Sequence, residues 1–261
     1  MTSLPKPSIL EDSCTSSIII SALTLSSALQ PLPMIPVQKK ALVVIFPGFN
    51  NLDVAGPVSV LYNSDFDVSY AAKDELTTSQ ENLTVRRTIS FAEAKLQMDD
   101  YEILIVPGSR PTTTLSLLQK EDGRSAEIID FIATFASGVN NSVRQRTILS
   151  VCMGAFLLAG GGVLDGLVAT THRLAVPGLR KVIASYVQQN PGAKGTKVVP
   201  ESSSDLIPYL DAGRNSAGVR IITSGPMAHG IDAALYFVSL LSGRSLSVEI
   251  AELIGHNWRE A

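Results

Sequence analysis

The sequence lacks the features by which proteins bind nucleic acids or cross membranes. Lys and Arg total 21 against 24 Asp and Glu, the net charge is −3, and no run is rich in basic residues. Such a chain has little attraction for a phosphate backbone or an anionic membrane surface. The apolar stretch at residues 18–29 is far shorter than a membrane span, and acidic rather than basic residues precede it. We therefore expect no nucleic-acid partner and no membrane partner.

Cysteine is scarce as well. The 261 residues include only Cys14 and Cys152, and no C-x-x-C spacing occurs. Two cysteines in so long a chain do not form a disulfide framework, and they do not have the spacing of a metal site. A reducing compartment is the simpler expectation, and we predict a soluble, cytoplasmic protein.

Apolar residues, by contrast, are plentiful. The chain is 45% hydrophobic and 17% charged, which supplies a large buried core. Residues 1–38 differ from the rest, because they are rich in Ser, Thr, Leu and Pro and keep no strand or helix period. We expect them to be an N-terminal extension, either flexible or docked on a partner subunit. Residues 39–261 should form one α/β domain.

Short apolar runs recur along this domain. A run at residues 41–46 ends in Pro47-Gly48, as expected for a strand buried on both faces of a parallel sheet. Similar runs lie at 68–72, 103–106, 147–151 and 220–224, and helical periods lie at 54–62, 124–138, 154–161, 176–189, 228–242 and 245–257. Alternating strands and helices predict a three-layer α/β sandwich with a mainly parallel central sheet. The polar segment 192–218 fits either a β-hairpin or a loop over the mouth of a site.

Cys152 stands where a strand meets a helix. The run 147–151 leads into Cys152, and Gly154 and Ala155 open the helical stretch. This pattern is typical of a nucleophile elbow with a thiol in place of a hydroxyl. The positive end of the helix would favour the thiolate, which is the nucleophilic form. A small buried hydrophobe is the alternative, but the carboxyl edge of a parallel sheet favours a reactive residue.

Asp53 lies after the first strand, at the start of a helix. It is either an N-cap or a carboxyl group that exchanges protons with the thiol, and the residues alone leave both roles open. His172 is one of three histidines and could pair with Cys152 in space, although a lone histidine is more often structural. His229 follows the last strand and could line the mouth of the site, whereas Asp232 is expected to cap or to form a salt bridge.

Four segments together resemble the ThiJ/PfpI superfamily and look most like its isonitrile hydratase branch. They are residues 52–57, 151–155, 162–166 with 169–172, and 230–232. The resemblance spans about residues 41–258 and implies a flavodoxin-like sandwich and, commonly, a homodimer. It implies that Cys152 is the catalytic nucleophile and Asp53 its acidic partner. The predicted site is lined by Gly48, Met153, Gly154, Thr171, His172, Pro226 and His229.

The resemblance also implies a reaction. A hydratase of this kind would convert an isonitrile, a small-molecule substrate, to an N-substituted formamide without a metal or organic cofactor. Met153 stands where protease-like members have histidine, which argues against that branch, and where the hydratase branch usually has threonine. The alternatives are a glyoxalase-like conversion of 2-oxoaldehydes without glutathione, in which histidine moves the proton, and a non-catalytic redox-sensing or binding protein that uses the same thiol.

We predict that the protein is a homodimer, because the apolar residues of the N-terminal extension need a covering surface and because the family it resembles commonly dimerises. Light scattering at micromolar concentration should give about twice the 27.8 kDa mass of one chain. A mass near that of one chain would refute the prediction.

Overall fold

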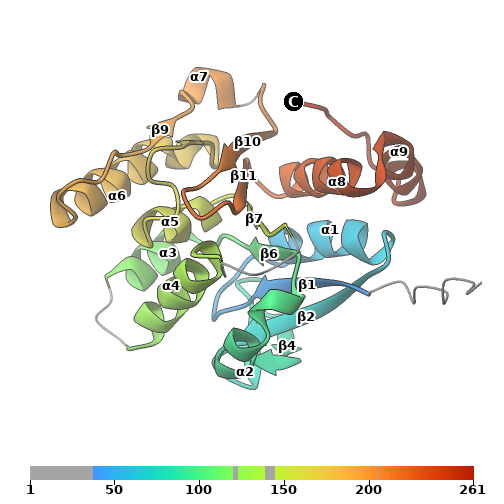
Figure 1. The fold of residues 1–261 in the computed structure, drawn as a ribbon, viewed down its shortest axis with the longest axis horizontal. Coiled ribbons are helices and arrows are strands. Elements are labelled where there is room, and N and C mark those ends of the chain that lie inside the picture. Colours follow the sequence, from blue (N-terminus) through green and yellow to red (C-terminus); the bar gives the residue numbers. More distant parts are fainter. Residues whose placement is uncertain (1–37, 120–122, 139–144, 205) are drawn as a thin grey trace, which may run out of the picture. The chain divides into compact units, whose positions relative to one another are not determined.

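The structure, a computed structural model, describes residues 38–119, 123–138, 145–204 and 206–261, which belong to one compact unit from Val37 to Ala261. The centre of this unit is a seven-stranded sheet with helices on both faces (Figure 1). In sheet order the strands are β10 (Tyr209–Arg214), β11 (Arg220–Ser224), β7 (Thr147–Ser150), β6 (Ile103–Val106), β1 (Lys39–Val44), β2 (Phe66–Ala72) and β5 (Ile89–Ser90). All neighbours pair in parallel except β10, which runs antiparallel to β11 at one edge.

The helices form two layers. One layer holds α1 (Asn51–Tyr62), α8 (Ala228–Ser242) and α9 (Arg244–Leu253). The other holds α2 (Phe91–Leu96), α3 (Pro111–Leu118), α4 (Gly123–Ala136), α5 (Gly154–Gly160) and α6 (Val176–Gln189). Because both faces are covered, every residue of β6 and β7 is buried, which explains their continuous apolar runs.

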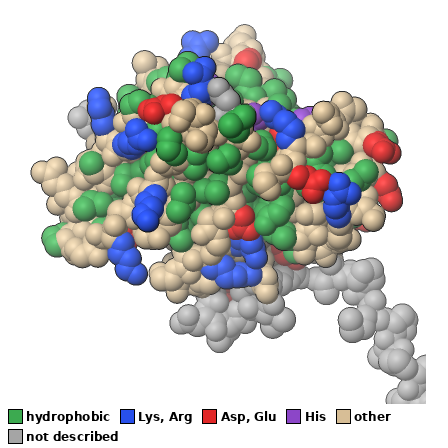
Figure 2. Space-filling view, turned by 90° about the horizontal axis from the view of Figure 1, so that it is seen from above, with side chains coloured by type: hydrophobic (Ala, Val, Ile, Leu, Met, Phe, Trp, Pro, Cys, Tyr) green, Lys and Arg blue, Asp and Glu red, His purple; other side chains and the backbone are tan. Residues whose placement is uncertain are grey.

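Short elements decorate this frame. They are the β3 (Leu76–Thr78) and β4 (Thr84–Arg86) hairpin, the β8 (Val168–Ala169) and β9 (Lys197–Val198) pair, the 3-10 turns η1 (Met98–Asp100) and η2 (Arg173–Ala175), and α7 (Glu201–Ser204). None of the helices in the described residues is both long enough and apolar enough to span a bilayer. On the face shown in Figure 2, Lys and Arg side chains are scattered among other side chains and form no continuous basic patch.

The predicted sandwich is confirmed. The five predicted strands are β1, β2, β6, β7 and β11, and the six predicted helices are α1, α4, α5, α6, α8 and α9. The segment 192–218 contains β10, whose antiparallel pairing with β11 matches the hairpin interpretation. Five shorter elements were not predicted: β3, β4, β5, α2 and α3. The predicted N-terminal extension, residues 1–38, lies outside the described residues apart from Gln38. The homodimer stays a prediction.

Two glycines let main chain meet main chain at the carboxyl edge of the sheet. A Cβ atom on Gly154 would lie 2.2 Å from the carbonyl oxygen of Val106, so α5 starts directly against the end of β6. A Cβ atom on Gly108 would lie 2.7 Å from the amide nitrogen of Met153 and 3.2 Å from the Cβ of Cys152. The turn after β7 is therefore pressed onto the turn after β6.

We predict that Gly154→Ala lowers the free energy of unfolding by about 2 kcal/mol or more, because backbone has to move to admit the methyl group. Gly161→Ala, at the other end of α5, is the matched control, since the nearest atom to its new Cβ would be Ile129 Cγ2, at 3.3 Å, and the backbone oxygens around it would lie at ordinary contact distance. Urea denaturation of both variants measures the difference. If both variants lose the same free energy of unfolding, the contact between Gly154 and Val106 contributes no more to stability than the contacts of Gly161.

Candidate active site

Cys152 occupies a strained turn between β7 and α5. Its φ is +55°, in the left-handed region that residues other than glycine rarely adopt. The N–H of Cys152 donates to the carbonyl oxygens of Ser224 at 3.2 Å and Gly225 at 3.1 Å, and the hydroxyl of Thr171 donates to the Cys152 carbonyl at 2.7 Å. These bonds hold a conformation that costs about 1 to 3 kcal/mol, and the result is the geometry of a nucleophile elbow.

Asp53 is the third residue of α1, and it does not cap that helix. The cap is Asn50, whose Oδ1 accepts from the N–H groups of Leu52 at 2.9 Å and of Asp53 at 3.1 Å. The Asp53 side chain is fully buried and turns toward β6, where Oδ2 accepts from the N–H of Gly108 at 2.9 Å. Of the two roles left open by the sequence, the N-cap is therefore wrong.

Burial controls the protonation of both groups. Burial raises the pKa of Asp53 to about 7, although hydrogen bonds from the main-chain N–H groups of Gly108 and Met227 act in the opposite direction and lower it. Burial also raises the pKa of the Cys152 thiol to about 12, and the charge of Asp53 adds to this, while the N–H of Met153 acts in the opposite direction. This upward direction is opposite to the one expected from the helix terminus, because desolvation outweighs the N–H of Met153.

The two groups meet across Gly108. A Cβ atom at Gly108 would lie 3.0 Å from Asp53 Oδ2 and 3.2 Å from the Cβ of Cys152, so only glycine leaves room for both side chains. Since the pKa of the thiol lies well above that of the carboxyl, the site at neutral pH pairs a thiol with a carboxyl that is about half ionised. The carboxylate form is positioned to take up a proton that the sulfur gives away.

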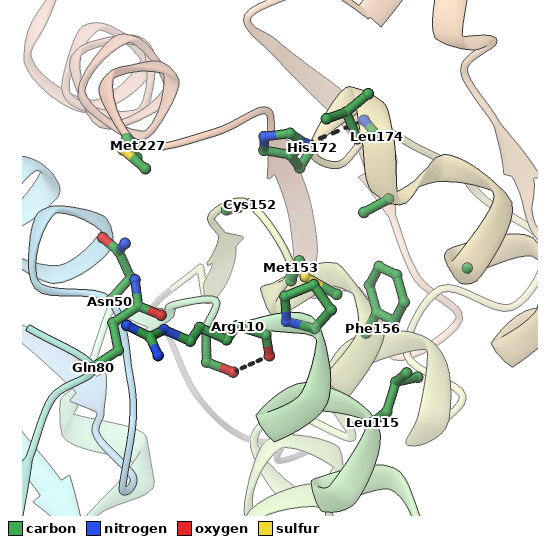
Figure 3. Close-up of a pocket in the computed structure, with 14 residues that line it drawn as sticks. Asn50, Gln80, Arg110, Leu115, Cys152, Met153, Phe156, His172, Leu174 and Met227 are labelled. Carbon is green, nitrogen blue, oxygen red and sulfur yellow. Dashed lines mark hydrogen bonds between the residues drawn. The ribbon is translucent and has the colours of Figure 1, made fainter.

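A pocket of about 420 Å³ opens above Cys152 (Figure 3). Its lining consists of Asn50, Gln80, Ser109, Arg110, Pro111, Leu115, Cys152, Met153, Phe156, His172, Leu174, Ala175, Gly178 and Met227. Most of the wall is apolar, with a few polar side chains, as is usual for small-molecule sites. The volume is enough for a compact organic substrate.

The family now follows from comparison with known proteins. Residues 39–207 match the DJ-1/PfpI family. The chain belongs to the DJ-1/PfpI family. Among curated proteins it is similar to an isonitrile hydratase from Pseudomonas putida, with 30% identity over 131 residues. That match covers 49% of this chain and 50% of the relative, so the chain spans about half the length of this relative.

Solved structures confirm the flavodoxin-like fold of this DJ-1/PfpI protein. A ThiJ/PfpI family protein from Pseudomonas syringae superposes with a TM-score of 0.63 at 20% identity, covering 92% of this chain and 86% of that one. Drosophila melanogaster DJ-1beta gives a TM-score of 0.60 at 17% identity, covering 85% of this chain and 100% of that one. At these identities the likeness concerns the fold alone.

His172 and Met153 line the pocket, as the sequence predicted. The Nδ1 atom of His172 accepts the N–H of Leu174 at 3.1 Å and caps η2, which leaves Nε2 as the protonated nitrogen of the neutral ring. The other predicted lining residues are not among the residues that line this pocket. They are Gly48, Gly154, Thr171, Pro226 and His229.

Four of these residues have identifiable contacts. Thr171 is buried under the elbow, and Gly154 packs on the carbonyl of Val106. His229 lies against Gly225, where a Cβ would stand 2.2 Å from its Nδ1, and Gly48 packs near Thr113. Gly154 and Thr171 therefore support the elbow, while the prediction that these five residues line the pocket does not hold for the pocket at Cys152.

Several lining residues were not predicted. Ser109 and Arg110 follow the predicted strand at 103–106, so the rule that sites collect at the carboxyl edge could have found them. Gln80 reaches the site from the β3–β4 hairpin, which was not predicted. Met227 precedes α8 with φ +45°, and of the described non-glycine residues with positive φ only Met227 and Cys152 line the pocket.

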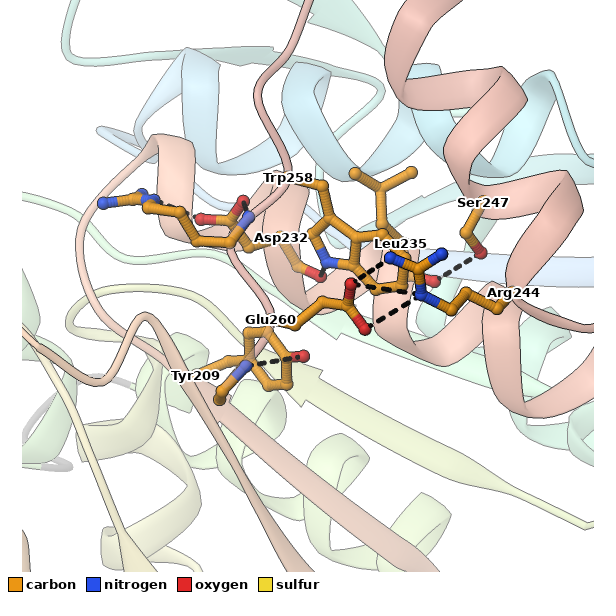
Figure 4. Close-up of polar contacts among 9 residues, drawn as sticks. Tyr209, Asp232, Leu235, Arg244, Ser247, Trp258 and Glu260 are labelled. Carbon is orange, nitrogen blue, oxygen red and sulfur yellow. Dashed lines mark hydrogen bonds and ion pairs between the residues drawn. The ribbon is translucent and has the colours of Figure 1, made fainter.

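Asp232 fixes the helix that begins after Met227 (Figure 4). Its fully buried carboxylate lies 2.7 Å from His256 Nε2. It also accepts two hydrogen bonds from Arg259, one from the backbone N–H at 3.0 Å and one from Nη2 at 2.8 Å. The indole N–H of Trp258 donates to the Asp232 carbonyl at 3.1 Å. The predicted salt bridge of Asp232 is confirmed, and it ties the last residues of the chain to α8.

The buried Asp53 carboxyl predicts a pH-dependent cost in stability. Because its folded-state pKa, about 7, exceeds its ordinary 3.8, the folded protein binds more protons than the unfolded chain between these pH values. Stability contributed by this group therefore falls as pH rises from about 4 to 7, by roughly 4 kcal/mol. Asp53→Asn should raise the melting temperature by several degrees at pH 8 and by little at pH 4.

Calorimetry at both pH values measures this difference. Asp67→Asn, at an exposed position of β2, controls for the loss of a carboxylate. An Asp53→Asn shift that is the same at pH 4 and pH 8 would contradict a raised pKa at Asp53.

Proposed function

We propose that the protein is a cysteine-dependent hydratase that converts an isonitrile to an N-substituted formamide. The observation that carries the proposal is the approach of the buried Asp53 carboxyl to Cys152 across Gly108, with Cys152 itself lining a largely apolar pocket. The curated relative named isonitrile hydratase, matched over half its length, supports the same reaction.

The reaction balances with these two groups alone. The Cys152 sulfur bonds to the terminal isonitrile carbon, and its proton passes through Asp53 to the same carbon, which gives a thioimidate. Water then adds to the carbon–nitrogen double bond, its hydroxyl going to carbon and its proton, again through Asp53, to nitrogen. The carbon–sulfur bond breaks, the hydroxyl proton returns to sulfur, and the formamide leaves with the thiol restored.

The pKa values of Cys152 and Asp53 suit this series of reaction steps. A thiol with a pKa of about 12 is not ionised beforehand, so it needs a base in contact, and Asp53 is the carboxylate whose charge acts on Cys152. A carboxyl with a pKa of about 7 both accepts and donates protons near neutral pH. The N–H of Met153 lowers the pKa of the thiol and thereby supports negative charge on sulfur as the proton departs.

The alternatives fit the site less well. A glyoxalase-like reaction needs histidine as the base, but the Nδ1 lone pair of His172 is occupied by the N–H of Leu174, and its neutral Nε2 carries the proton. A redox sensor needs an accessible thiolate, whereas burial raises the pKa of Cys152 to about 12. His172 is therefore assigned a substrate-contacting role as a donor.

We predict a pH profile and a set of variants for this reaction. With an isonitrile as substrate, kcat/KM should rise with pH through about pH 7, because the ionised carboxyl is the form that accepts the thiol proton. Cys152→Ser should remove activity, and Asp53→Asn should lower kcat about 100-fold or more and abolish the titration near pH 7. Both effects are measured by steady-state kinetics from pH 5 to 9.

The control for the carboxylate is Asp67→Asn, which should keep wild-type turnover. A panel of isonitriles and 2-oxoaldehydes tests the reaction class at the same time. Turnover of 2-oxoaldehydes alone, or a stable Asp53→Asn variant with full activity on an isonitrile, would refute the proposed mechanism.

A further inference from the structure

The walls of the pocket differ in chemistry on the two sides of Cys152 (Figure 3). One side carries the polar side chains of Asn50, Gln80 and Arg110. The other carries the apolar side chains of Leu115, Met153 and Phe156. A substrate that reaches the sulfur therefore has one polar and one apolar surface beside it.

Arg110 brings a permanent positive charge to the polar wall. A guanidinium is a planar cation that offers several N–H donors to an anion. Glu81, the acidic neighbour of Gln80 in sequence, has both carboxylate oxygens engaged: Oε2 accepts from the N–H of Asn51 at 3.0 Å, and Oε1 accepts from Gln80 Nε2 at 2.8 Å. Within the described part of the chain, Arg110 forms no ion pair.

Asn50 adds an oriented donor to the same wall. Its Oδ1 is consumed by capping α1, which fixes the amide and leaves the Nδ2 group as the end that is available for a ligand. Only 7% of Asn50 is exposed, so this amide is held in place. A fixed amide donor beside a guanidinium suits a carboxylate, which accepts several charge-assisted hydrogen bonds.

We propose that Arg110 and Asn50 bind a carboxylate on the substrate, so that the preferred substrates are α-isocyano carboxylates with an apolar side chain. The inference rests on the proposed function and names its substrate class. The isonitrile carbon meets the Cys152 sulfur, the carboxylate lies on the polar wall, and the side chain packs toward Leu115 and Phe156. The product is then an N-formyl amino acid.

The test compares two alkylating agents of nearly equal size, anionic iodoacetate and neutral iodoacetamide. Their rates at the Cys152 peptide are measured by mass spectrometry at pH 9, and the ratio of the two rates is the readout. Changes in thiol pKa or in folding affect both reagents and cancel in the ratio. Arg110→Gln should lower the iodoacetate-to-iodoacetamide ratio about fivefold, the effect of losing one favourable charge contact.

Two further variants sharpen the result. Arg110→Lys keeps the charge and should retain most of the ratio. Arg180→Gln removes an equal charge from α6, where the guanidinium faces Glu201 at 3.4 Å, and should leave the ratio at its wild-type value. An unchanged ratio in Arg110→Gln, or an equal fall in Arg180→Gln, would overturn the carboxylate site.

Kinetics with isocyanoacetate and methyl isocyanoacetate separate this inference from the proposed function. In the wild type the acid should have the lower KM, and Arg110→Gln should raise the KM of the acid relative to that of the ester. Turnover of both with no preference for the acid would support the hydratase and refute the carboxylate site. Turnover of neither would refute the hydratase, and the alkylation ratio would then decide the anion site.

Discussion

The contact between the turn after β6 and the start of α5 is the constraint on which the site depends. Gly154 sits against the Val106 carbonyl, and Gly108 sits between Asp53 and Cys152, so neither position has room for a side chain. This close approach brings the carboxyl near Cys152 and contributes to the burial of both groups. The same packing therefore produces the geometry of the site and its raised pKa values.

Much of the fold could be predicted because the buried elements have strong sequence patterns. The apolar run at 103–106 and the helical periods at 176–189 and 228–242 coincide with β6, α6 and α8 to the residue. The elements that the sequence did not show, such as β3, β4 and α2, are short and carry exposed side chains, so burial leaves little pattern in them. Their position depends on packing between segments that are distant along the chain.

The site could be predicted in part, because parallel strands bring their exit loops to one edge. That rule placed Asp53 and Cys152 together. It could not give the sign of the thiol pKa shift, which depends on how much of the surrounding chain covers the sulfur. Nor could it separate Asn50 from Asp53 as the cap of α1, since both precede the same helical run and only the direction of their side chains distinguishes them. Gln80 could not be predicted as a site residue because the β3–β4 hairpin that carries it was not predicted.

The burial of Asp232 has a consequence for how the protein is made. Ribosomes synthesise chains from the N-terminus, so α8 emerges before His256 and Arg259, which neutralise and hydrogen-bond this carboxylate. Until they arrive, docking α8 on the sheet would bury an uncompensated charge, which is costly. The loop that carries Met227 therefore settles only after residues 256–259 have left the ribosome, and the pocket that Met227 lines is completed no earlier.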